Sequence, residues 1–446
     1  MSYRLRPATA DDAQAMFETQ VAAFSTEEGT LRWEQARDFC FDRAEQHVVM
    51  VDESDYVVGL VHIHDHPIQV GSCFVRKADV GHVGIRPELQ GLGVGTQMMR
   101  DTVAWLGEQG YHLSRLGGLT HFYSRFGYEP FPRRFVRIDL GSVRGGGRHI
   151  PATELYSDPG EWPGEVRAYD ESRDFAERTR LRWEYDSGRS GAMVVADQFE
   201  PPTHPAPPDP EALCWVYERE GQVLGFLHAV ESPLESTGEE TVFTISELVY
   251  AQDFPDAAGA LVRMLLSRIC DRGQVLVTSR LPWDEAVAEA LQLAGIAHYR
   301  MEMFQAVASN MILVVDLANT LQAIAPELSA RVADSLVADW SGAVELAFPM
   351  RGKCRIDDPA SVTAGDALPG EACRLVLDVG EVTVDAGPGP VDLQIALTQA
   401  HVVKALFGIT ALTELPCVRG MDLSPTERGV LDALFPRTKT GSGPWG

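Results

Sequence analysis

Blocks of apolar residues with strand or helix periodicity follow one another along the whole chain. In the first 140 residues, short runs rich in Val, Ile and Leu predict strands, and apolar residues spaced three and four apart predict amphipathic helices. The predicted strands cover residues 3–7, 47–51, 56–64, 70–74, 80–85, 111–116 and 136–140, and the predicted helices cover 13–24, 31–44 and 96–106. This order indicates a mixed sheet with helices on its faces, closed by the strand at 136–140.

A similar order of elements returns after residue 170, and a third block begins at residue 311. The second block has predicted strands at 213–217, 223–229, 243–249, 274–278 and 299–304, and predicted helices at 174–185, 257–270 and 284–293. The third block has predicted helices at 316–336 and 398–407, and predicted strands at 342–348, 373–379, 381–384 and 391–397. Its strands follow one another as a meander, which is typical of an α+β unit.

Segments poor in apolar residues separate these blocks. Residues 141–165 are rich in Gly, Pro and Ser and are predicted to form a linker, and the prolines of 200–210 predict an extended loop. A chain of 446 residues is long enough for two to four domains. We therefore predict a chain of α/β and α+β class with three domains, at residues 1–142, 143–308 and 309–446.

A glycine-rich turn follows the predicted strand 80–85. Pro87 stops the strand, and the stretch Gln90-Gly91-Leu92-Gly93-Val94-Gly95 forms a loop before the next helix. Glycines let the backbone approach a ligand closely, and the amides at a helix N-terminus carry partial positive charge, so the turn is suited to hold a pyrophosphate. A dinucleotide site and a purely structural turn are the alternatives. A dinucleotide site needs Gly-x-Gly-x-x-Gly directly after the first strand of the chain. Here the glycines are spaced Gly-x-Gly-x-Gly, and several predicted elements precede them.

The same stretch resembles the acetyl-CoA motif of the GNAT superfamily of N-acetyltransferases, Gln/Arg-x-x-Gly-x-Gly/Ala. The run from Phe122 to Tyr128 resembles the end of a GNAT domain. The resemblance implies that acetyl-CoA is a co-substrate and that the preceding strand offers backbone N–H groups to its pantetheine and thioester. The coenzyme-binding residues that it implies are Val83, Gly84, Ile85, Gln90, Gly91, Leu92, Gly93, Val94, Gly95 and Thr96.

The second block resembles a degenerate GNAT fold. Where the glycine turn would lie, residues 250–256 contain a proline, two carboxylates and no glycine, so we expect that acetyl-CoA does not bind there. The third block resembles the sterol-carrier-protein-like fold through its strand at 391–397 and the helix that follows. Tandem GNAT folds followed by a sterol-carrier-like α+β domain are the architecture of the Eis (enhanced intracellular survival) family. That resemblance implies N-acetylation of an aminoglycoside or a lysine, by a homo-oligomer that is a hexamer or a trimer.

The resemblance also implies residues for the chemistry. Tyr123 matches the tyrosine that acts as general acid, and the pKa of a phenol near 10 is close to that of a leaving thiol. Two carboxylates are candidate bases: Asp79, where many GNAT enzymes carry a glutamate, and the C-terminal carboxylate of Gly446, which in the Eis family enters the active site. Arg125 is a candidate to contact a coenzyme phosphate, and Tyr128 is a second candidate for the catalytic hydroxyl. Packing within the turn is the alternative for these residues and for Tyr123. The alternatives are a solvated strand edge for Asp79 and a frayed chain end for Gly446.

Three histidines alternate along one predicted strand, a spacing that by itself would allow a metal site. Acetyl transfer needs no metal, and no cysteine or carboxylate pattern supports one, so we expect none. Lining of the acceptor cleft and ordinary partly buried positions remain open for these histidines, as do an acceptor pocket and helix packing for three aromatic residues. The residues concerned are His62, His64 and His66, and Phe24, Trp33 and Phe41.

The composition limits the classes of molecule that the protein is expected to bind. A formal net charge of −26 argues against nucleic acid and anionic membranes as partners and fits a cationic acceptor. Seven scattered cysteines without a Cys-x-x-Cys pair indicate reduced thiols in a cytoplasmic protein. No apolar signal core and no run of about 18 apolar residues occur, so we expect no membrane segment.

The favoured hypothesis is an enzyme, an N-acetyltransferase that transfers the acetyl group of acetyl-CoA directly to a primary amine in a ternary complex. The acceptor is expected to be a small cationic molecule resembling an aminoglycoside, or a lysine. The alternative is a non-catalytic protein that carries acyl-CoA or a lipid. That alternative predicts a deep cavity lined by Leu and Val in residues 311–446.

Overall fold

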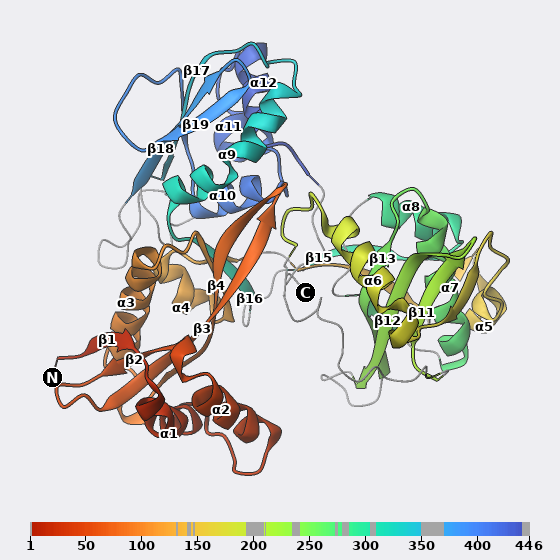
Figure 1. Cartoon of the computed structure of the whole chain (residues 1–446), viewed down its shortest axis with the longest axis horizontal. Coiled ribbons are helices and arrows are strands. Elements are labelled where there is room, and N and C mark those ends of the chain that lie inside the picture. The colour runs from red at the N-terminus through yellow and green to blue at the C-terminus, as the bar shows by residue number, and fades with distance from the viewer. Residues whose placement is uncertain are drawn as a thin grey trace.

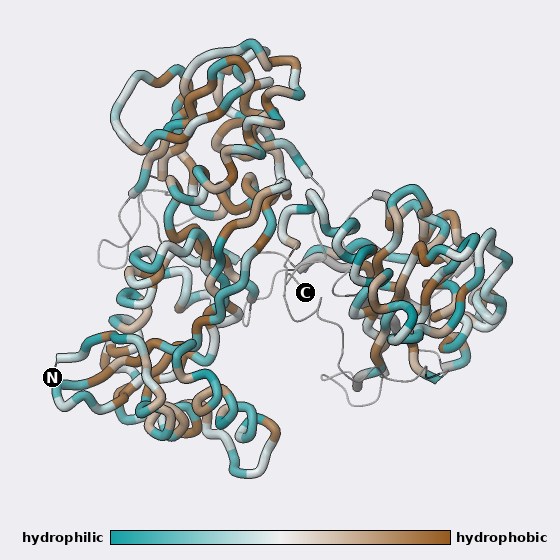
Figure 2. Tube along the Cα trace, viewed as in Figure 1, coloured by the Kyte–Doolittle hydropathy of each residue, from teal (hydrophilic) through white to brown (hydrophobic). Residues whose placement is uncertain are grey.

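A computed structural model describes most of the chain and divides it into three units, seen as separate lobes in Figure 1. It describes residues 2–130, 133–140, 144–145, 148–192, 209, 211–233, 241–272, 275–278, 285–303, 309–348 and 370–438. Within each unit the hydrophobic segments lie mainly on strands and on the inner sides of helices (Figure 2). Three of the four clusters of buried apolar side chains belong mainly to one unit each, and the first unit has a further small one.

The first unit is a seven-stranded mixed sheet in the order β1-β2-β3-β4-β5-β16-β6. Its elements are β1 (Arg4–Pro7), α1 (Ala13–Phe24), α2 (Leu31–Asp42), β2 (His47–Val51), β3 (Val57–Val70), β4 (Cys73–Ile85), α3 (Val94–Glu108), β5 (Leu113–Gly118), α4 (Thr120–Tyr123), β6 (Glu129–Pro130) and β16 (Ser309–Val314). Strand alternation gives the sheet two apolar faces. Val49 and Val51 pack with Met16 of α1 and Cys40 of α2, whereas Val48 and Met50 pack with Met98 of α3 on the other face. The predicted mixed sheet flanked by helices is confirmed.

The second unit is built on another seven-stranded sheet, in the order β10-β11-β12-β13-β14-β7-β15. Its elements are β7 (Arg133–Asp139), α5 (Ala152–Tyr156), β10 (Glu165–Ala168), α6 (Glu171–Asp186), β11 (Cys214–Arg219), β12 (Gln222–Pro233), β13 (Thr241–Tyr250), α7 (Pro255–Ile269), β14 (Val275–Thr278), α8 (Glu285–Leu293) and β15 (Tyr299–Met303). In place of a glycine turn, α7 begins at Pro255 after Phe254, and Asp256 in its first turn accepts a hydrogen bond of 2.6 Å from the Tyr217 hydroxyl.

The first two sheets exchange strands. β7 was expected to close the first sheet, but it pairs antiparallel with β14 and β15 in the second. The place beside β5 is taken instead by β16, a strand that the sequence pattern did not reveal. Figure 1 shows β16 in teal beside the orange strands of the first unit. The expectation that residues 136–140 complete the first unit is therefore wrong: a run of alternating apolar residues fits either sheet equally well, and only the path of the chain decides between them.

The third unit has a four-stranded sheet in the order β19-β18-β17-β20, with helices packed against it. Its elements are α9 (Leu317–Ala333), β17 (Gly342–Phe348), β18 (Glu371–Asp378), β19 (Glu381–Asp385), β20 (Leu393–Ala396), α10 (Gln399–Leu406), α11 (Pro416–Arg419) and α12 (Pro425–Leu434). β20 runs parallel to β17 and the other pairs are antiparallel. The predicted strands and the predicted helices at 316–336 and 398–407 agree with the structure, whereas α11 and α12 were not predicted.

The long hairpin of β3 and β4 connects all three units. A strand was predicted at residues 70–74, but Gly71 and Ser72 instead form the tight turn of this hairpin, because Gly71 adopts a positive φ of 58°. The Ser72 hydroxyl donates a hydrogen bond of 2.7 Å to Glu327 of α9 in the third unit. The backbone of Gln69 exchanges hydrogen bonds of 2.7 and 2.8 Å with Gly191 and Ala192 of the second.

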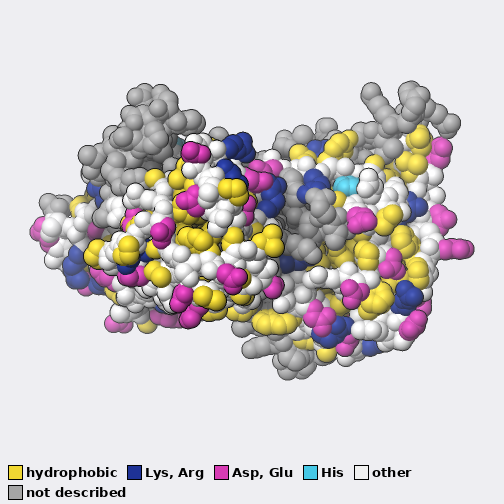
Figure 3. Space-filling view, turned by 90° about the horizontal axis from the view of Figure 1, so that it is seen from above, with side chains coloured by type: hydrophobic (Ala, Val, Ile, Leu, Met, Phe, Trp, Pro, Cys, Tyr) yellow, Lys and Arg dark blue, Asp and Glu magenta, His cyan; other side chains and the backbone are white. Residues whose placement is uncertain are grey.

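The excess of acidic residues does not form one patch on the face seen in Figure 3, where acidic, basic and hydrophobic side chains are interleaved. Among the described residues, no helix is long and apolar enough to cross a membrane. In the same part of the chain, no group of three or more His, Cys, Asp or Glu side chains is placed to hold a metal ion. The six cysteines that can be described are free thiols.

Candidate functional site

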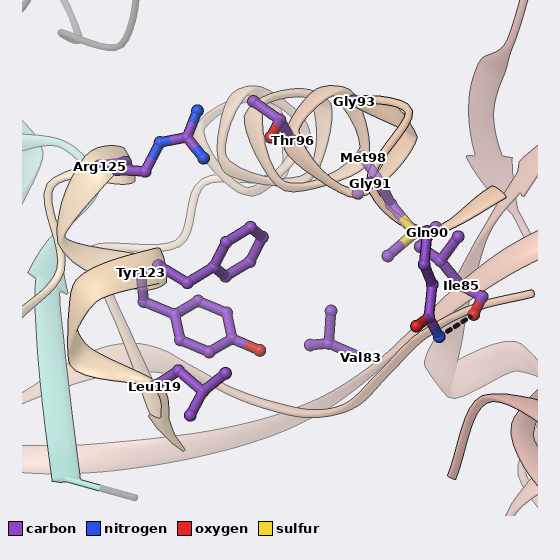
Figure 4. A pocket seen from close by; sticks show the side chains of 12 residues that line it. Val83, Ile85, Gln90, Gly91, Gly93, Thr96, Met98, Leu119, Tyr123 and Arg125 are labelled. Atoms are coloured by element: carbon purple, nitrogen blue, oxygen red, sulfur yellow. Dashed lines mark hydrogen bonds between the residues drawn. The ribbon is translucent and has the colours of Figure 1, made fainter. Parts of the chain in front are cut away.

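A cavity of about 520 Å³ opens in the first unit between the end of β4, the glycine loop and α4 (Figure 4). Strand, loop, helix and the aromatic turn each contribute side chains or backbone to it. It is lined by Val83, Ile85, Gln90, Gly91, Gly93, Gly95, Thr96, Met98, Leu119, Phe122, Tyr123 and Arg125. The structure therefore brings the two motifs of the sequence, around residues 90 and 123, to opposite sides of one space.

The glycine loop has a conformation that depends on its glycines. Gly91 and Gly93 have φ values of 77° and 87°, in the left-handed region that other residues rarely adopt. A Cβ atom at either position would meet no other atom within 4 Å, so the requirement comes from the backbone. The Gln90 side chain donates a hydrogen bond of 3.0 Å to the carbonyl of Ile85, drawn as a dashed line in Figure 4. This bond ties the loop to the end of β4.

Helix α3 begins directly behind this loop without a side-chain cap. Gly93 is the N-cap residue and has no side chain to cap the helix, and no acidic residue lies in the first turn of α3. The first N–H groups of a helix have no acceptor within the helix and carry partial positive charge. Gly95 and Thr96 of this first turn line the cavity, so the amides are available to an anionic group within it.

Strands β4 and β5 separate where the cavity begins. Their parallel pairing ends at Val80 and Leu116, whereas β4 continues to Ile85. The β5 side of residues 81–85 is thus not paired with that strand. Val83 and Ile85 of this segment line the cavity, which leaves their backbone edge open to a ligand.

Tyr123 closes the opposite side of the cavity. Figure 4 shows its hydroxyl pointing into the space toward Val83. Its ring packs edge-on against Phe122 and Tyr128, with centroid distances of 5.0 and 6.2 Å. Burial raises the pKa of the Tyr123 phenol to about 12, so the group keeps its proton at any physiological pH. Tyr123 is therefore in the protonated form that a general acid requires, although its raised pKa makes it a weaker acid than the free phenol considered from the sequence.

The two other candidates from the aromatic turn, Tyr128 and Arg125, have different surroundings. Tyr128 is fully buried, its hydroxyl lies 2.7 Å from Ser114 Oγ, and burial raises its pKa. It does not line the cavity, which supports the packing alternative for this residue. Arg125 does line the cavity, and its guanidinium lies 5.9 Å from the centre of the Phe126 ring.

Asp79 lies in a network of charged groups on β4 and its neighbours. Its carboxylate accepts hydrogen bonds of 2.5 Å from Lys77 and 3.0 Å from His66, and Arg115 lies at 3.6 Å. Burial alone would raise the pKa of Asp79, but the hydrogen bond from His66 and the charges of Lys77 and Arg115 hold it well below its ordinary value. Asp79 is therefore ionised and strongly paired, and it does not line the 520 Å³ cavity.

The three predicted histidines lie on β3 and have separate roles. His66 donates to Asp79, and the rings of His64 and His66 are 3.7 Å apart. His62 is buried beside His47 and hydrogen-bonds Gln46, and burial with the nearby histidines lowers its pKa to about 3. Trp33 and Phe41 pack on Phe17 at centroid distances of 5.2 and 6.1 Å, as expected for helix packing.

Of the ten coenzyme-binding residues predicted, seven line the cavity. Gly84 faces α1, Leu92 points to solvent and Val94 is buried in the apolar core, so only their backbone could face a coenzyme. Gly446 lies outside the described residues. The sequence reasoning did not identify Met98 and Leu119, whose apolar side chains gave no signal that separated them from core residues. The donor set, a cationic helix end and backbone amides beside an apolar wall, fits a coenzyme with a diphosphate and a thioester.

Comparisons with known proteins agree with this geometry. Residues 4–131 match a family model described as "Acetyltransferase (GNAT) domain". Among curated proteins, none matches the chain. Three solved structures with similar folds are a probable N-acyltransferase from Enterococcus faecalis, a GCN5-related N-acetyltransferase from Kribbella flavida and Eis1 from Mycobacterium abscessus. Their TM-scores are 0.66, 0.60 and 0.57 and their identities 15%, 20% and 15%; each comparison covers 99% of this chain and 98% of the other. The TM-scores and coverage show that the fold is shared over nearly the whole chain, and the family match identifies residues 4–131 as a GNAT acetyltransferase domain.

Proposed function

We propose that this protein transfers the acetyl group of acetyl-CoA to a primary amine. The observation that carries the proposal is the cavity in which an uncapped helix N-terminus, the open edge of β4 and the hydroxyl of Tyr123 face one space. A helix end with free amides binds phosphate, and an open strand edge binds the amide groups of an extended ligand. Acetyl-CoA has both, together with a reactive thioester.

Each side of the cavity has its own task in this proposal. Bound acetyl-CoA supplies the acetyl thioester. The amides of residues 91–96 hold the diphosphate, and the N–H groups of Val83 and Ile85 orient the pantetheine and polarise the thioester carbonyl. As the amine nitrogen bonds to the acetyl carbon and the carbon–sulfur bond breaks, Tyr123 donates its proton to the leaving sulfur. The amine gives up one proton in the same reaction.

Two carboxylates are proposed to receive the amine proton, Asp79 and the C-terminal carboxylate of Gly446. The depressed pKa of Asp79 makes it a weak base. Its negative charge would instead attract the amine proton by way of His66, which donates a hydrogen bond to Asp79. Variants separate the two. Asp79→Asn lowers kcat if Asp79 acts, and removal of Gly446 lowers kcat if the chain end acts.

Further features of the Eis family are also proposed for this chain: an aminoglycoside-like or lysine acceptor, a sterol-carrier-like third domain, and a homo-oligomer of three or six copies. What supports them is the fold shared over nearly the whole chain with Eis1 from Mycobacterium abscessus. A cytoplasmic location is proposed separately, and the free thiols of the described cysteines support it. The division into domains at residues 142 and 308 likewise remains a proposal, with the exchange of β7 and β16 across it.

The experiment is a titration of the purified protein with acetyl-CoA, followed by thiol release with a panel of primary amines. Acetyl-CoA is expected to bind with a dissociation constant between about 1 μM and 1 mM, the usual range for enzyme substrates. Free thiol should appear in step with the acetylated amine. No heat of binding, or binding without thiol release for any amine, would refute the enzymatic proposal; the second result would favour a carrier.

A further inference from the structure

A second cavity of about 250 Å³ lies on the other side of β4, beneath helices α1 and α2. Neither the family match nor the sequence motifs assign it a role. It is lined by Gln20, Phe24, Thr26, Arg32, Gln35 and His82. These residues come from α1, the loop after it, the first turns of α2, and β4.

The end of β4 is the wall that separates this cavity from the coenzyme cavity. Val83 and Ile85 line the coenzyme cavity, whereas His82 lines the second one. Gly84 also faces the second side, because a Cβ atom there would lie 3.4 Å from the Phe24 ring. Since β4 and β5 diverge after Val80, a molecule in the second cavity is only one strand away from the thioester proposed above.

His82 is held in an uncommon conformation that directs it to this cavity. Its φ is 48°, in the left-handed region, at an irregularity in the pairing of β3 and β4. A non-glycine residue in this region stores strain and persists where the surroundings impose it, often at functional sites. Here Gln20 lies 2.7 Å from Nδ1 of His82, and the Phe39 ring packs 4.6 Å from the imidazole.

The hydrogen bonds of Gln20 define which nitrogen of His82 carries the proton. The Gln20 carbonyl oxygen accepts from the Cys40 thiol at 3.5 Å, which directs the Gln20 amide NH₂ toward His82 Nδ1. Nδ1 is then the acceptor, so in the neutral ring Nε2 carries the hydrogen. Burial lowers the pKa of His82, which keeps the ring neutral. His82 therefore offers a hydrogen-bond donor, not a base, to its surroundings.

The charge of the cavity is opposite to that of the chain. Arg32 is its only charged lining residue, and no carboxylate is among the six residues that line it, although Asp and Glu outnumber Lys and Arg by 64 to 38 in the chain. Glu27, Glu28 and Glu34 of the same region are exposed and do not line the cavity. An arginine and an imidazole N–H together provide charge-assisted and neutral donors for an oxyanion.

We propose that this second cavity binds a carboxylate group of the acceptor, so that the acceptor is a small molecule with both a primary amine and a carboxylate, as in an amino acid. The inference rests on the proposed acetyl transfer and specifies its substrate class: of the two acceptors proposed above, it favours lysine over an aminoglycoside. The carboxylate pairs with Arg32 and accepts from His82, while the amine extends past Gly84 toward the gap between β4 and β5. A polycation would place a positive charge beside Arg32 with no carboxylate in the lining to compensate it.

The test uses the full-length protein and pairs of primary amines that differ only in a carboxylate or the corresponding carboxamide. The wild type should have a kcat/KM about 10-fold or more higher for the carboxylate member, the effect of one charge-assisted hydrogen bond. Arg32→Gln should remove this preference. Arg37→Gln, on the same helix but outside the lining, is the matched control and should keep the preference.

A charge reversal gives a readout that a merely structural role of Arg32 would not produce. Arg32→Glu should invert the preference, so that a diamine becomes a better acceptor than the amino acid. His82→Phe should weaken use of the carboxylate member while acetyl-CoA binding, measured by calorimetry, is retained. If the wild type acetylates amines but prefers polycations or ignores the carboxylate, this inference is overturned and the acetyltransferase proposal stands. If no amine releases thiol, both are overturned.

Discussion

A methyl group added at Gly118 would test the position of Tyr123 directly. A Cβ atom at Gly118 would lie 2.3 Å from Cε2, 2.8 Å from Cδ2 and 3.3 Å from Cζ of the Tyr123 ring. Ordinary contacts of this kind begin at 3.4 Å, so the ring must retreat by about 1 Å to restore contact distance. Phe122 and Tyr128 pack against the ring at 5.0 and 6.2 Å between centroids, so the movement changes where the hydroxyl points.

The substitution is expected to lower the rate of the chemical step. Displacement of a reacting group by about 1 Å reduces rates by about 10²-fold, so Gly118→Ala should lower kcat by that order. The KM for acetyl-CoA should change little, because Gly118 does not line the coenzyme cavity. Overpacking should also cost about 1–3 kcal/mol of the free energy of unfolding, which leaves a protein of ordinary stability folded.

The neighbouring glycine provides the control. A Cβ atom at Gly117, on the same strand, would meet no other atom within 4 Å. Gly117→Ala should therefore keep kcat near that of the wild type. The assay is thiol release at saturating acetyl-CoA with an amine that the wild type uses, together with thermal unfolding of both variants. If both variants fold and the kcat of Gly118→Ala is within about twofold of that of Gly117→Ala, the proposed placement of the proton donor is refuted.

Four other predictions concern the acid, the glycine loop, the buried charges and the strand exchange. Tyr123→Phe should lower kcat by about 10²- to 10⁴-fold without weakening acetyl-CoA binding in calorimetry; an unchanged kcat would exclude it as the acid. Gly93→Ala strains a φ of 87° and should weaken acetyl-CoA binding by about tenfold, whereas Gly110→Ala, at φ 73° far from the cavity, should strain the backbone equally and leave affinity unchanged. Burial lowers the pKa of Lys77 to about 8 from 10.5, against the opposing effect of Asp79, so between these values Lys77 contributes a free energy of unfolding that rises with pH. The buried thiols of Cys40 and Cys214, whose pKa burial raises to about 12, contribute in the opposite direction. In denaturant titrations between pH 8 and 10, the free energy of unfolding of Lys77→Met should therefore fall more steeply with pH than that of the wild type, and equal slopes would contradict the prediction. Residues 1–142 expressed alone should not fold cooperatively, because Met311 and Leu313 of β16 are fully buried in the first core; a cooperative thermal transition would show that β16 is dispensable.

Local patterns were sufficient for most elements and for the coenzyme side of the site. The glycine loop could be predicted because its conformation depends on the residues within it, with Gly91 and Gly93 at positive φ and Pro87 before them. Tyr123 could be identified because the short aromatic turn that contains it resembles the end of a GNAT domain. In both cases the residues that determine the structure are close in sequence, so the information is local.

What could not be predicted depends on contacts between distant segments. The insertion of β16 beside β5 joins residues about 200 apart, and no periodicity distinguishes a partner for β5 from any other apolar strand. Phe24 was a candidate for an acceptor pocket and does line the second cavity, but the other residues of this cavity were missed for the same reason. Gln20, Arg32 and His82 belong to three elements, and the role of His82 follows from an irregularity in strand pairing and from the Cys40–Gln20 contact, which no motif records.

On the two proposals above, β4 contacts both reactants, and its hairpin is hydrogen-bonded to the other two units. A strand presents successive residues to opposite sides, so one segment of four residues can contact a coenzyme with Val83 and Ile85 and an acceptor with His82 and Gly84. The reaction then depends on the position of this segment to within a fraction of an ångström, since both reactants are aligned by it. The hairpin that contains β4 is bound at its tip by the second unit through Gln69 and by the third through Ser72. All three units therefore restrain the strand on which we propose that the reactants meet, and the described residues that line the two cavities lie in the first.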